Sequence, residues 1–298
     1  MTALEQPATR EQSRARYPDE EGCVERDGVR VFYEVYGSGD PTILFVPPWA
    51  IVHSRVWKLQ VPYLARHGRV VTFDPRGNGK SDRPRDAAQY GEYAYAADAL
   101  AVLDATETEQ AFLVTMSLGA QRSLILAAEH PNRIRGIVCF APSLSIAPGH
   151  AHRDAYPFDQ PLDTDEGWAK FNAHYWLRDY PGFVEFFISQ CVTEPHSTKP
   201  IEDGIGWGLE TDGETLLALS SSRFIDQAEI HDLCGRLRCP MLVILGVEDE
   251  VSPHARGVAL AAATGATFLT VAGGGHFTHA RDPVRANLAI REFVERLS

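Results

Sequence analysis

The alternation of short apolar runs with segments of helical periodicity constrains the fold of this chain more than any other feature. The expected strands lie at residues 42–46, 69–73, 111–114, 134–140, 241–245 and 267–271, and the first two have the composition of buried strands. Segments with apolar residues at helical spacing lie between or after them, at residues 55–66, 92–106, 117–129, 253–263 and 283–296. Strands that alternate with helices predict a mostly parallel sheet, with helices on both faces and right-handed crossovers.

A hairpin precedes this alternation and one long segment interrupts it. Asp27-Gly28 separates two β-rich runs, 24–26 and 29–36, and predicts a tight turn. Residues 143–232 contain no clear strand, are rich in Trp, Tyr, Phe and Pro, and are too long for a loop. The predicted organisation is a flexible N-terminal tail (1–21), a core in two parts (22–142 and 233–298) and a helical cap (143–232).

Ser117 is the predicted nucleophile, because it stands between an apolar run and a helical segment. A nucleophile exposed on a strand-to-helix turn needs small residues two positions before and two after it. Gly119 fits this need, whereas Thr115 stands where glycine is usual. Ser117 is the only serine followed by x-Gly. The structural alternative is an ordinary serine at a helix N-cap.

His276 is the predicted general base. It follows the run 267–271 and three consecutive glycines, which allow the backbone to bend so that the imidazole reaches another loop. A neutral imidazole can accept the serine proton near neutral pH. His279 and His254 are the alternatives, and His279 stands where it could pack near the start of a helix.

Asp249 is the predicted acid that orients the histidine. It ends a Gly-x-x-Asp sequence after the run 241–245, while its neighbours Glu248 and Glu250 are expected to be solvated. The segment after residue 140 offers no acid up to residue 147. The chain order serine, aspartate, histidine is that of the α/β-hydrolases, and differs from the orders in chymotrypsin and subtilisin.

Two backbone N–H groups are needed to stabilise a developing oxyanion. Leu118, directly after the serine, should supply one. The loop after residues 42–46 should supply the other, and since Pro47 and Pro48 have no N–H, Trp49 is expected to donate, with Ala50 in reserve.

Together these residues resemble the α/β-hydrolase superfamily, in its cap-bearing esterase, lipase and dehalogenase-like branch. The resemblance covers residues 23–298, and its most specific segment is D-x-R-G-x-G-x-S at residues 74–81. The other matching segments are residues 43–57, 114–128, 129–131, 246–253 and 275–277. The resemblance implies a sheet of about eight strands with a helical cap over the active site.

The chain departs from the family pattern at two places. Pro47-Pro48 stands where His-Gly is frequent, and Met116 stands where His or Asn is frequent. The nucleophile is serine and not aspartate, which argues against haloalkane dehalogenase and epoxide hydrolase chemistry on the same fold.

The expected reaction is hydrolysis of a carboxylic ester or lactone through an acyl-enzyme, with no metal or organic cofactor. The aromatic cap suggests an apolar pocket for a small-molecule substrate, lined by Trp49, Met116, Trp176 and Phe277. His150, His152 and Asp154 are expected to be solvated in a loop, without a metal. The alternatives are a perhydrolase or non-heme haloperoxidase, a thioester or C–C bond hydrolase, and a ligand-binding protein without hydrolytic activity.

Composition bounds the partners and the compartment. The net charge of −12 disfavours nucleic acid, and the longest apolar runs are too short to cross a bilayer. The five cysteines are scattered without a C-x-x-C pair, and the N-terminus has no apolar signal segment. We therefore expect a soluble cytoplasmic protein, while the oligomeric state stays open.

Overall fold

A single eight-stranded sheet organises the chain in the computed structural model, which describes residues 14–195, 198–222 and 225–298. Its strands stand in the order β1-β2-β4-β3-β5-β6-β7-β8. β2 is antiparallel to both of its neighbours, and all the other pairs are parallel. The strands are β1 (Glu20–Arg26), β2 (Val29–Tyr36), β3 (Thr42–Val46), β4 (Arg69–Phe73), β5 (Ala111–Met116), β6 (Ile134–Phe140), β7 (Met241–Gly246) and β8 (Thr267–Val271). The predicted mostly parallel sheet of about eight strands is confirmed.

Helices cover both faces of this sheet. Side chains alternate along the central strands: Ile43 and Phe45 join one apolar cluster, whereas Leu44 and Val46 join the other. The first cluster includes residues of α1 (Val61–Leu64) and α11 (Pro283–Glu295). The second includes residues of α2 (Glu92–Ala105), α3 (Gly119–Glu129), α8 (Gln227–Arg236) and α9 (His254–Thr264). Two buried layers therefore hold the strands in a fixed register.

The helix predicted over residues 55–66 is instead two short pieces. A 3₁₀ helix, η1 (Ser54–Trp57), comes first and the single turn α1 follows. Pro62 lies in the first turn of α1, where its missing N–H costs nothing. Inside a continuous helix the same proline would remove a hydrogen bond and clash with the preceding turn.

The N-terminal hairpin has the predicted turn. Asp27 and Gly28 have φ angles of 55° and 76°, as a two-residue turn that matches the strand twist requires. Part of the predicted flexible tail, residues 1–13, lies outside the described residues. The rest differs from the prediction, because Glu20 begins β1 and Arg14 pairs with the buried Glu34 at 2.8 Å.

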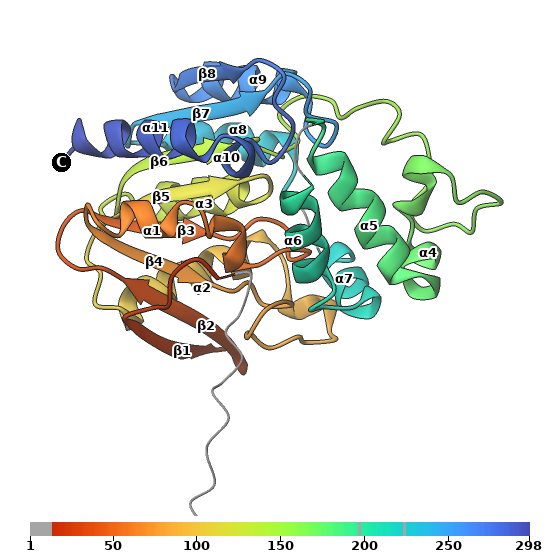
Figure 1. Ribbon diagram of the computed structural model, residues 1–298, viewed down its shortest axis with the longest axis horizontal. Helices are drawn as coiled ribbons and strands as arrows, with labels where there is room; N and C mark the ends of the chain where they lie inside the picture. The colour runs from red at the N-terminus through yellow and green to blue at the C-terminus, as the bar shows by residue number, and fades with distance from the viewer. Residues whose placement is uncertain (1–13, 196–197, 223–224) are drawn as a thin grey trace, which may run out of the picture.

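Helices fill the C-terminal part of the segment predicted as a cap, whereas residues 143–166 contain none. η3 (Gly167–Lys170) precedes four helices of this segment, α4 (Ala173–Arg178), α5 (Tyr180–Cys191), α6 (Lys199–Gly208) and α7 (Gly213–Ser220). Figure 1 shows these helices gathered beyond one end of the sheet. The predicted boundary at residue 232 falls inside α8, which packs on α3 and α9 with the core. Two short elements complete the described helices, η2 (Ala87–Gln89) and α10 (Thr278–Arg281).

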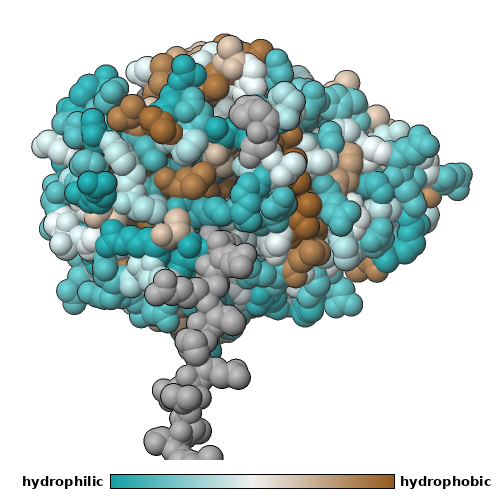
Figure 2. All heavy atoms as spheres, in the orientation of Figure 1, coloured by the Kyte–Doolittle hydropathy of each residue, from teal (hydrophilic) through white to brown (hydrophobic). Residues whose placement is uncertain are grey.

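The face seen in Figure 2 is mostly hydrophilic and carries separate hydrophobic patches. Among the described residues, the longest apolar helices fall short of what is needed to cross a bilayer.

Candidate active site

Ser117 occupies a strained turn between β5 and α3. Its φ angle is 53°, in the left-handed region that few residues other than glycine adopt. The turn is held by hydrogen bonds on both sides: the Ser117 N–H donates to the Phe140 carbonyl at 3.0 Å, and the Ser117 carbonyl accepts the Ser143 N–H at 3.0 Å. Strain of this kind costs about 1–3 kcal/mol and persists only where the surroundings impose it.

Gly119 makes the turn possible by its lack of a side chain. A Cβ at this position would lie 2.0 Å from Thr115 Oγ1 and 2.9 Å from the Pro47 carbonyl oxygen. Thr115 is fully buried at the place where the family usually has glycine. The larger residue two positions before the serine thus leaves room for glycine alone two positions after it.

His276 and Asp249 form a buried pair next to this turn. His276 Nδ1 and Asp249 Oδ2 lie 2.8 Å apart. The second carboxylate oxygen, Asp249 Oδ1, accepts the N–H groups of Val251 and Ser252, both at 2.8 Å. The backbone N–H of His276 donates to the Cys191 carbonyl at the end of α5, at 3.0 Å. Helix α5 therefore supports the loop that carries the histidine.

The alternatives to this pair lie elsewhere. Glu248 is exposed, and Glu250 pairs with His152 at 3.3 Å. His254 contacts Thr270 Oγ1 at 3.2 Å on an exposed helix start. His279 is fully buried against Trp57 at a ring distance of 4.7 Å.

Burial, reinforced by the nearby His276, lowers the pKa of His279 to about 3. This imidazole is therefore neutral and part of the core.

Arg122 fixes the loop in which the second oxyanion donor was predicted. From α3 it donates to the carbonyls of Pro47 and Pro48, at 2.9 and 2.6 Å, and to Glu92 at 2.8 Å. The guanidinium also lies over the Tyr95 ring at 3.7 Å. These contacts turn the two proline carbonyls toward α3.

The backbone N–H groups of Trp49 and Leu118 remain available. Both residues line the cavity that contains Ser117. Within residues 14–195, 198–222 and 225–298, neither of these N–H groups is among the donors to backbone carbonyls in turns, loops and caps.

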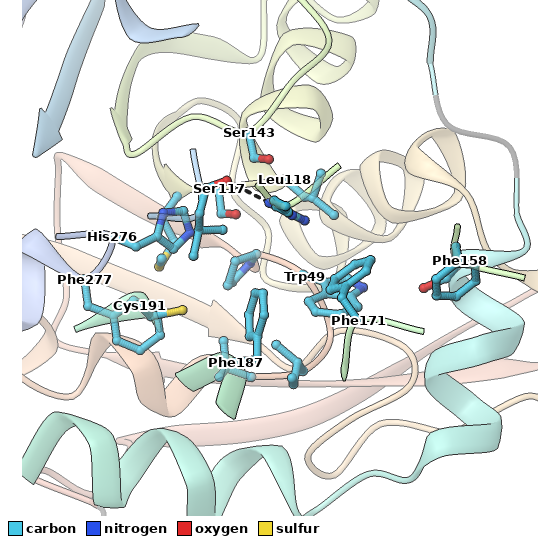
Figure 3. A pocket seen from close by; sticks show the side chains of 17 residues that line it. Trp49, Ser117, Leu118, Ser143, Phe158, Phe171, Phe187, Cys191, His276 and Phe277 are labelled. Carbon is cyan, nitrogen blue, oxygen red and sulfur yellow. Dashed lines mark hydrogen bonds between the residues drawn. The ribbon is translucent and has the colours of Figure 1, made fainter. Parts of the chain in front are cut away.

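A cavity of about 210 Å³ joins these residues, which is small for a ligand site. Ser117 and His276 both line it, and Figure 3 shows their side chains near each other, with Trp49, Phe171 and Phe187 across from them. Of the predicted pocket residues, Trp49, Met116 and Phe277 line the cavity. Trp176 does not. It is fully buried behind the wall and packs against Trp49 at a ring distance of 5.7 Å.

Several lining residues escaped the sequence analysis. They come from the cap and from loops, and include Ser143, Arg153, Phe158, Phe171, Phe187, Cys191, Ser220 and Val251. Aromatic residues of the cap were expected to form a pocket, but no sequence signal distinguishes those that face the cavity from those that pack behind it.

The segment at residues 74–81 is a structural support outside the cavity. Asp74 accepts the N–H groups of Ser54 at 3.2 Å and Lys80 at 2.8 Å. A Cβ at Gly79 would lie 2.3 Å from Asp74 Oδ2, so this carboxylate needs the glycine beside it. Arg76 forms two hydrogen bonds to Asp98, both at 2.6 Å.

His150 and His152 take part in contacts with the Asp249 loop. His150 Nε2 lies 2.7 Å from the Asp249 carbonyl oxygen, and the two imidazole rings stack at 5.0 Å. In the part of the chain that the structure describes, no group of three His, Cys, Asp or Glu side chains is placed to hold a metal ion.

Comparison with known proteins identifies the family. The family model described as alpha/beta hydrolase fold matches residues 41–283. The chain is 29% identical to the 2-hydroxymuconate semialdehyde hydrolase of Pseudomonas sp. (strain CF600), over 90% of this chain and 91% of the relative. It is 23% identical to 3-oxoadipate enol-lactonase 2 of Acinetobacter baylyi, over 91% and 95%.

A solved structure described as Est816, an N-acyl homoserine lactone degrading enzyme, has a TM-score of 0.75 and 25% identity. The similarity covers 92% of this chain and 100% of that one. The esterase RhEst1 from Rhodococcus sp. ECU1013 has a TM-score of 0.77 over 94% of this chain and 99% of its own, and at 23% identity it supports the fold alone. The family match spans most of the chain, and the protein is a member of the alpha/beta hydrolase fold family.

Proposed function

We propose that this protein is a serine hydrolase that cleaves a small carboxylic ester or lactone. The observation that carries the proposal is a single cavity lined by Ser117, on a left-handed turn, and by His276, whose Nδ1 is hydrogen-bonded to Asp249. A serine held this way, beside an imidazole oriented by a carboxylate, has the parts that nucleophilic acyl transfer needs.

In the proposed mechanism, Ser117 Oγ attacks the substrate carbonyl while His276 Nε2 accepts its proton. The negative oxygen of the tetrahedral intermediate receives hydrogen bonds from the N–H groups of Leu118 and Trp49. When the intermediate collapses, the C–O bond to the alcohol breaks and His276 returns the proton to the leaving oxygen.

Water completes the cycle. His276 accepts a proton from water as the water oxygen attacks the acyl carbonyl, and returns this proton to Ser117 Oγ when the acid leaves. Asp249 Oδ2 orients His276 through Nδ1 and stabilises the imidazolium in both halves of the reaction, while the N–H groups of Val251 and Ser252 hold the carboxylate in place through Oδ1.

Two comparisons favour ester or lactone chemistry. One relative is named as an enol-lactonase, and a similar structure is described as degrading N-acyl homoserine lactones. Another relative is a bifunctional esterase/perhydrolase, 25% identical over 76% of this chain, so peroxide should be compared with water as the acyl acceptor in the ester assays described next.

A fluorophosphonate probe and a panel of esters, lactones and thioesters test the proposal. We expect labelling and ester turnover in the native protein, and a loss of both in Ser117→Ala, by about 10⁴-fold or more for turnover. Folding of the variant is checked by circular dichroism. A native protein that neither reacts with the probe nor turns over any ester would refute the proposal and favour a ligand-binding protein.

A further inference from the structure

The cavity wall carries one strongly basic side chain and no carboxylate. Its lining side chains are mostly apolar or hydroxyl-bearing, and Arg153 is the only Lys or Arg among them. No Asp or Glu of the described residues lines the cavity. A guanidinium stays protonated in proteins, so the charge of this wall is positive.

Arg153 is short of partners for a half-buried cation. Nη1 donates to the Val251 carbonyl at 2.7 Å. The guanidinium carbon lies 5.0 Å from the centre of the Phe171 ring and 5.4 Å from that of Trp168. Among the described residues, no ion pair joins Arg153 to a carboxylate, and its one hydrogen bond is to a backbone carbonyl.

The charges around Arg153 do not neutralise it. The positive charge of Arg256 repels the Arg153 guanidinium. The negative charges of Asp154 and Asp249 attract it without forming an ion pair with it. Asp249 is already committed to His276 and to two backbone N–H groups. Burial and the neighbouring Arg256 together lower the pKa of Arg153. None of the Arg153 nitrogens is among the described side-chain atoms that are fully buried without a hydrogen-bond partner.

The structural contacts of this side chain do not by themselves require an arginine. Its contact with Val251 joins the loop after β6 to the loop after β7, but one neutral donor could make that bond. An arginine has five N–H donors arranged as a fork that matches the two oxygens of a carboxylate. A charge partly removed from water without a counterion also favours an anionic ligand.

We propose that Arg153 binds a carboxylate group of the substrate, so that the substrate is an ester or lactone that carries a second, ionised acid group. This inference rests on the proposed hydrolase function. The small cavity keeps such a substrate short, with the reacting carbonyl at Ser117 and the carboxylate toward Arg153. The local positive charge also offsets the repulsion of anions by a protein whose net charge is −12.

The test compares matched pairs of substrates. One set contains 4-nitrophenyl half-esters of succinate, glutarate and adipate, and the other contains 4-nitrophenyl esters of the same chain length that end in a methyl group. For the best-fitting length, we expect kcat/KM of the native protein to be about 10- to 100-fold higher for the anionic ester, the usual effect of a charge-assisted hydrogen bond.

Arg153→Met should reduce this ratio to about one, chiefly through a higher KM for the anionic ester, and Arg153→Lys should restore part of it. Arg256→Met is the matched control, since Arg256 lies close by but does not line the cavity. This control should keep the ratio of the native protein.

A second measurement needs no variant. Glutarate should inhibit the native protein competitively at least 10-fold more strongly than glutaramide, which has the same length and no charge. Equal inhibition, or a native ratio near one that Arg153→Met leaves unchanged, would overturn the inference. In either case, hydrolysis of the neutral esters that is lost in Ser117→Ala would leave the proposed hydrolase function standing.

Discussion

At the scale of single residues, the site depends on a larger residue before Ser117 and a glycine after it. Thr115 fills the space that a glycine usually leaves empty, and Gly119 lies so close to it that no side chain fits. The left-handed φ angle of Ser117 adds strain to the same few residues. The turn therefore tolerates less change on the helix side than on the strand side.

Gly119→Ala should destabilise the protein by about 1–3 kcal/mol, because the new methyl group collides with the Thr115 hydroxyl and the Pro47 carbonyl. Turnover should fall with it, as the serine moves. Urea unfolding and ester kinetics measure both effects. Combining it with Thr115→Gly should recover part of the loss, because one of the two colliding groups is then absent.

The matched control for this prediction is Gly206→Ala in α6, where an added Cβ meets nothing within 4 Å. There the substitution should be neutral or stabilising, since alanine favours a helix. If Gly119→Ala were as well tolerated as Gly206→Ala, the crowding argument would be wrong.

The residues of the site were predictable to the extent that their chemistry is tied to local sequence. Ser117, Asp249 and His276 each follow a recognisable strand, and parallel strands bring the loops at their carboxyl ends to one edge of the sheet. Arg153 was not predictable, because an arginine in a polar loop looks solvated until the cap folds over it. Trp176 was misplaced because composition indicates that an aromatic residue is buried, but not which wall it faces.

At the scale of elements, the boundaries of several strands followed directly from the sequence, including those of β8, which lies at the sheet edge and is not buried. Strands β3, β4, β6 and β8 begin and end where the apolar runs do. The short helices were harder, since α1 and α10 are single turns whose formation depends on tertiary contacts and not on periodicity. The contact between α3 and the loop after β3 was likewise invisible in the sequence.

That contact leads to a prediction about Arg122. Replacing the buried pair together, as Arg122→Met with Glu92→Gln, removes the bonds to Pro47 and Pro48 without leaving an unpaired buried charge. If Trp49 is the oxyanion donor, its loop loses its anchor, and kcat should fall about 10- to 100-fold with a smaller change in KM. Steady-state kinetics on a neutral ester measure the two constants separately.

Arg236→Met is the control. It replaces the same type of residue, but in an exposed ion pair with Asp232. It should change neither constant measurably. A doubly substituted protein that is folded by circular dichroism and has the native kcat would show that the proline loop does not depend on Arg122.

At the scale of the whole molecule, the relation between the cap and the core rests on contacts that are distant in sequence. Asn78 donates to the Trp207 carbonyl at 3.2 Å, and Thr211 donates to the Gly77 carbonyl at 2.6 Å. Arg85 pairs with Asp212 at 2.5 Å across the same boundary. Sequence patterns predicted that residues 143–232 would be helical, but they carry no information on which core loops would hold them.

His53 is a buried titratable group at this boundary. Its Nδ1 lies 3.5 Å from Asp74 Oδ1 in the core, and its Nε2 lies 3.2 Å from Glu210 Oε1 between α6 and α7. The Trp207 ring, at 6.2 Å, is the other neighbour. Burial opposes the charge of His53, but the two carboxylates outweigh burial and raise its pKa to about 9.

The stabilisation by His53 should therefore depend on pH in a defined direction. Because the pKa is raised from 6.5 to about 9 on folding, the contribution is complete below about pH 6.5 and is lost as pH rises through about 9. Near pH 6 to 7, His53→Gln should lower the free energy of unfolding by about 3 kcal/mol, as expected when one partner of a buried pair is removed. Above pH 9 the difference between the two proteins should shrink.

Urea unfolding of both proteins across this pH range measures the difference. Glu210→Gln provides the comparison from the cap side, and its effect should be smaller, because the side chain of Glu210 is 49% exposed, whereas that of Asp74 is 2% exposed. Loss of the His53 charge at high pH should slow turnover if residues 198–222 detach from the core before the core unfolds. A difference between native protein and His53→Gln that stayed constant from pH 6 to pH 10 would mean that His53 is neutral at this boundary and does not join the cap to the core through its charge.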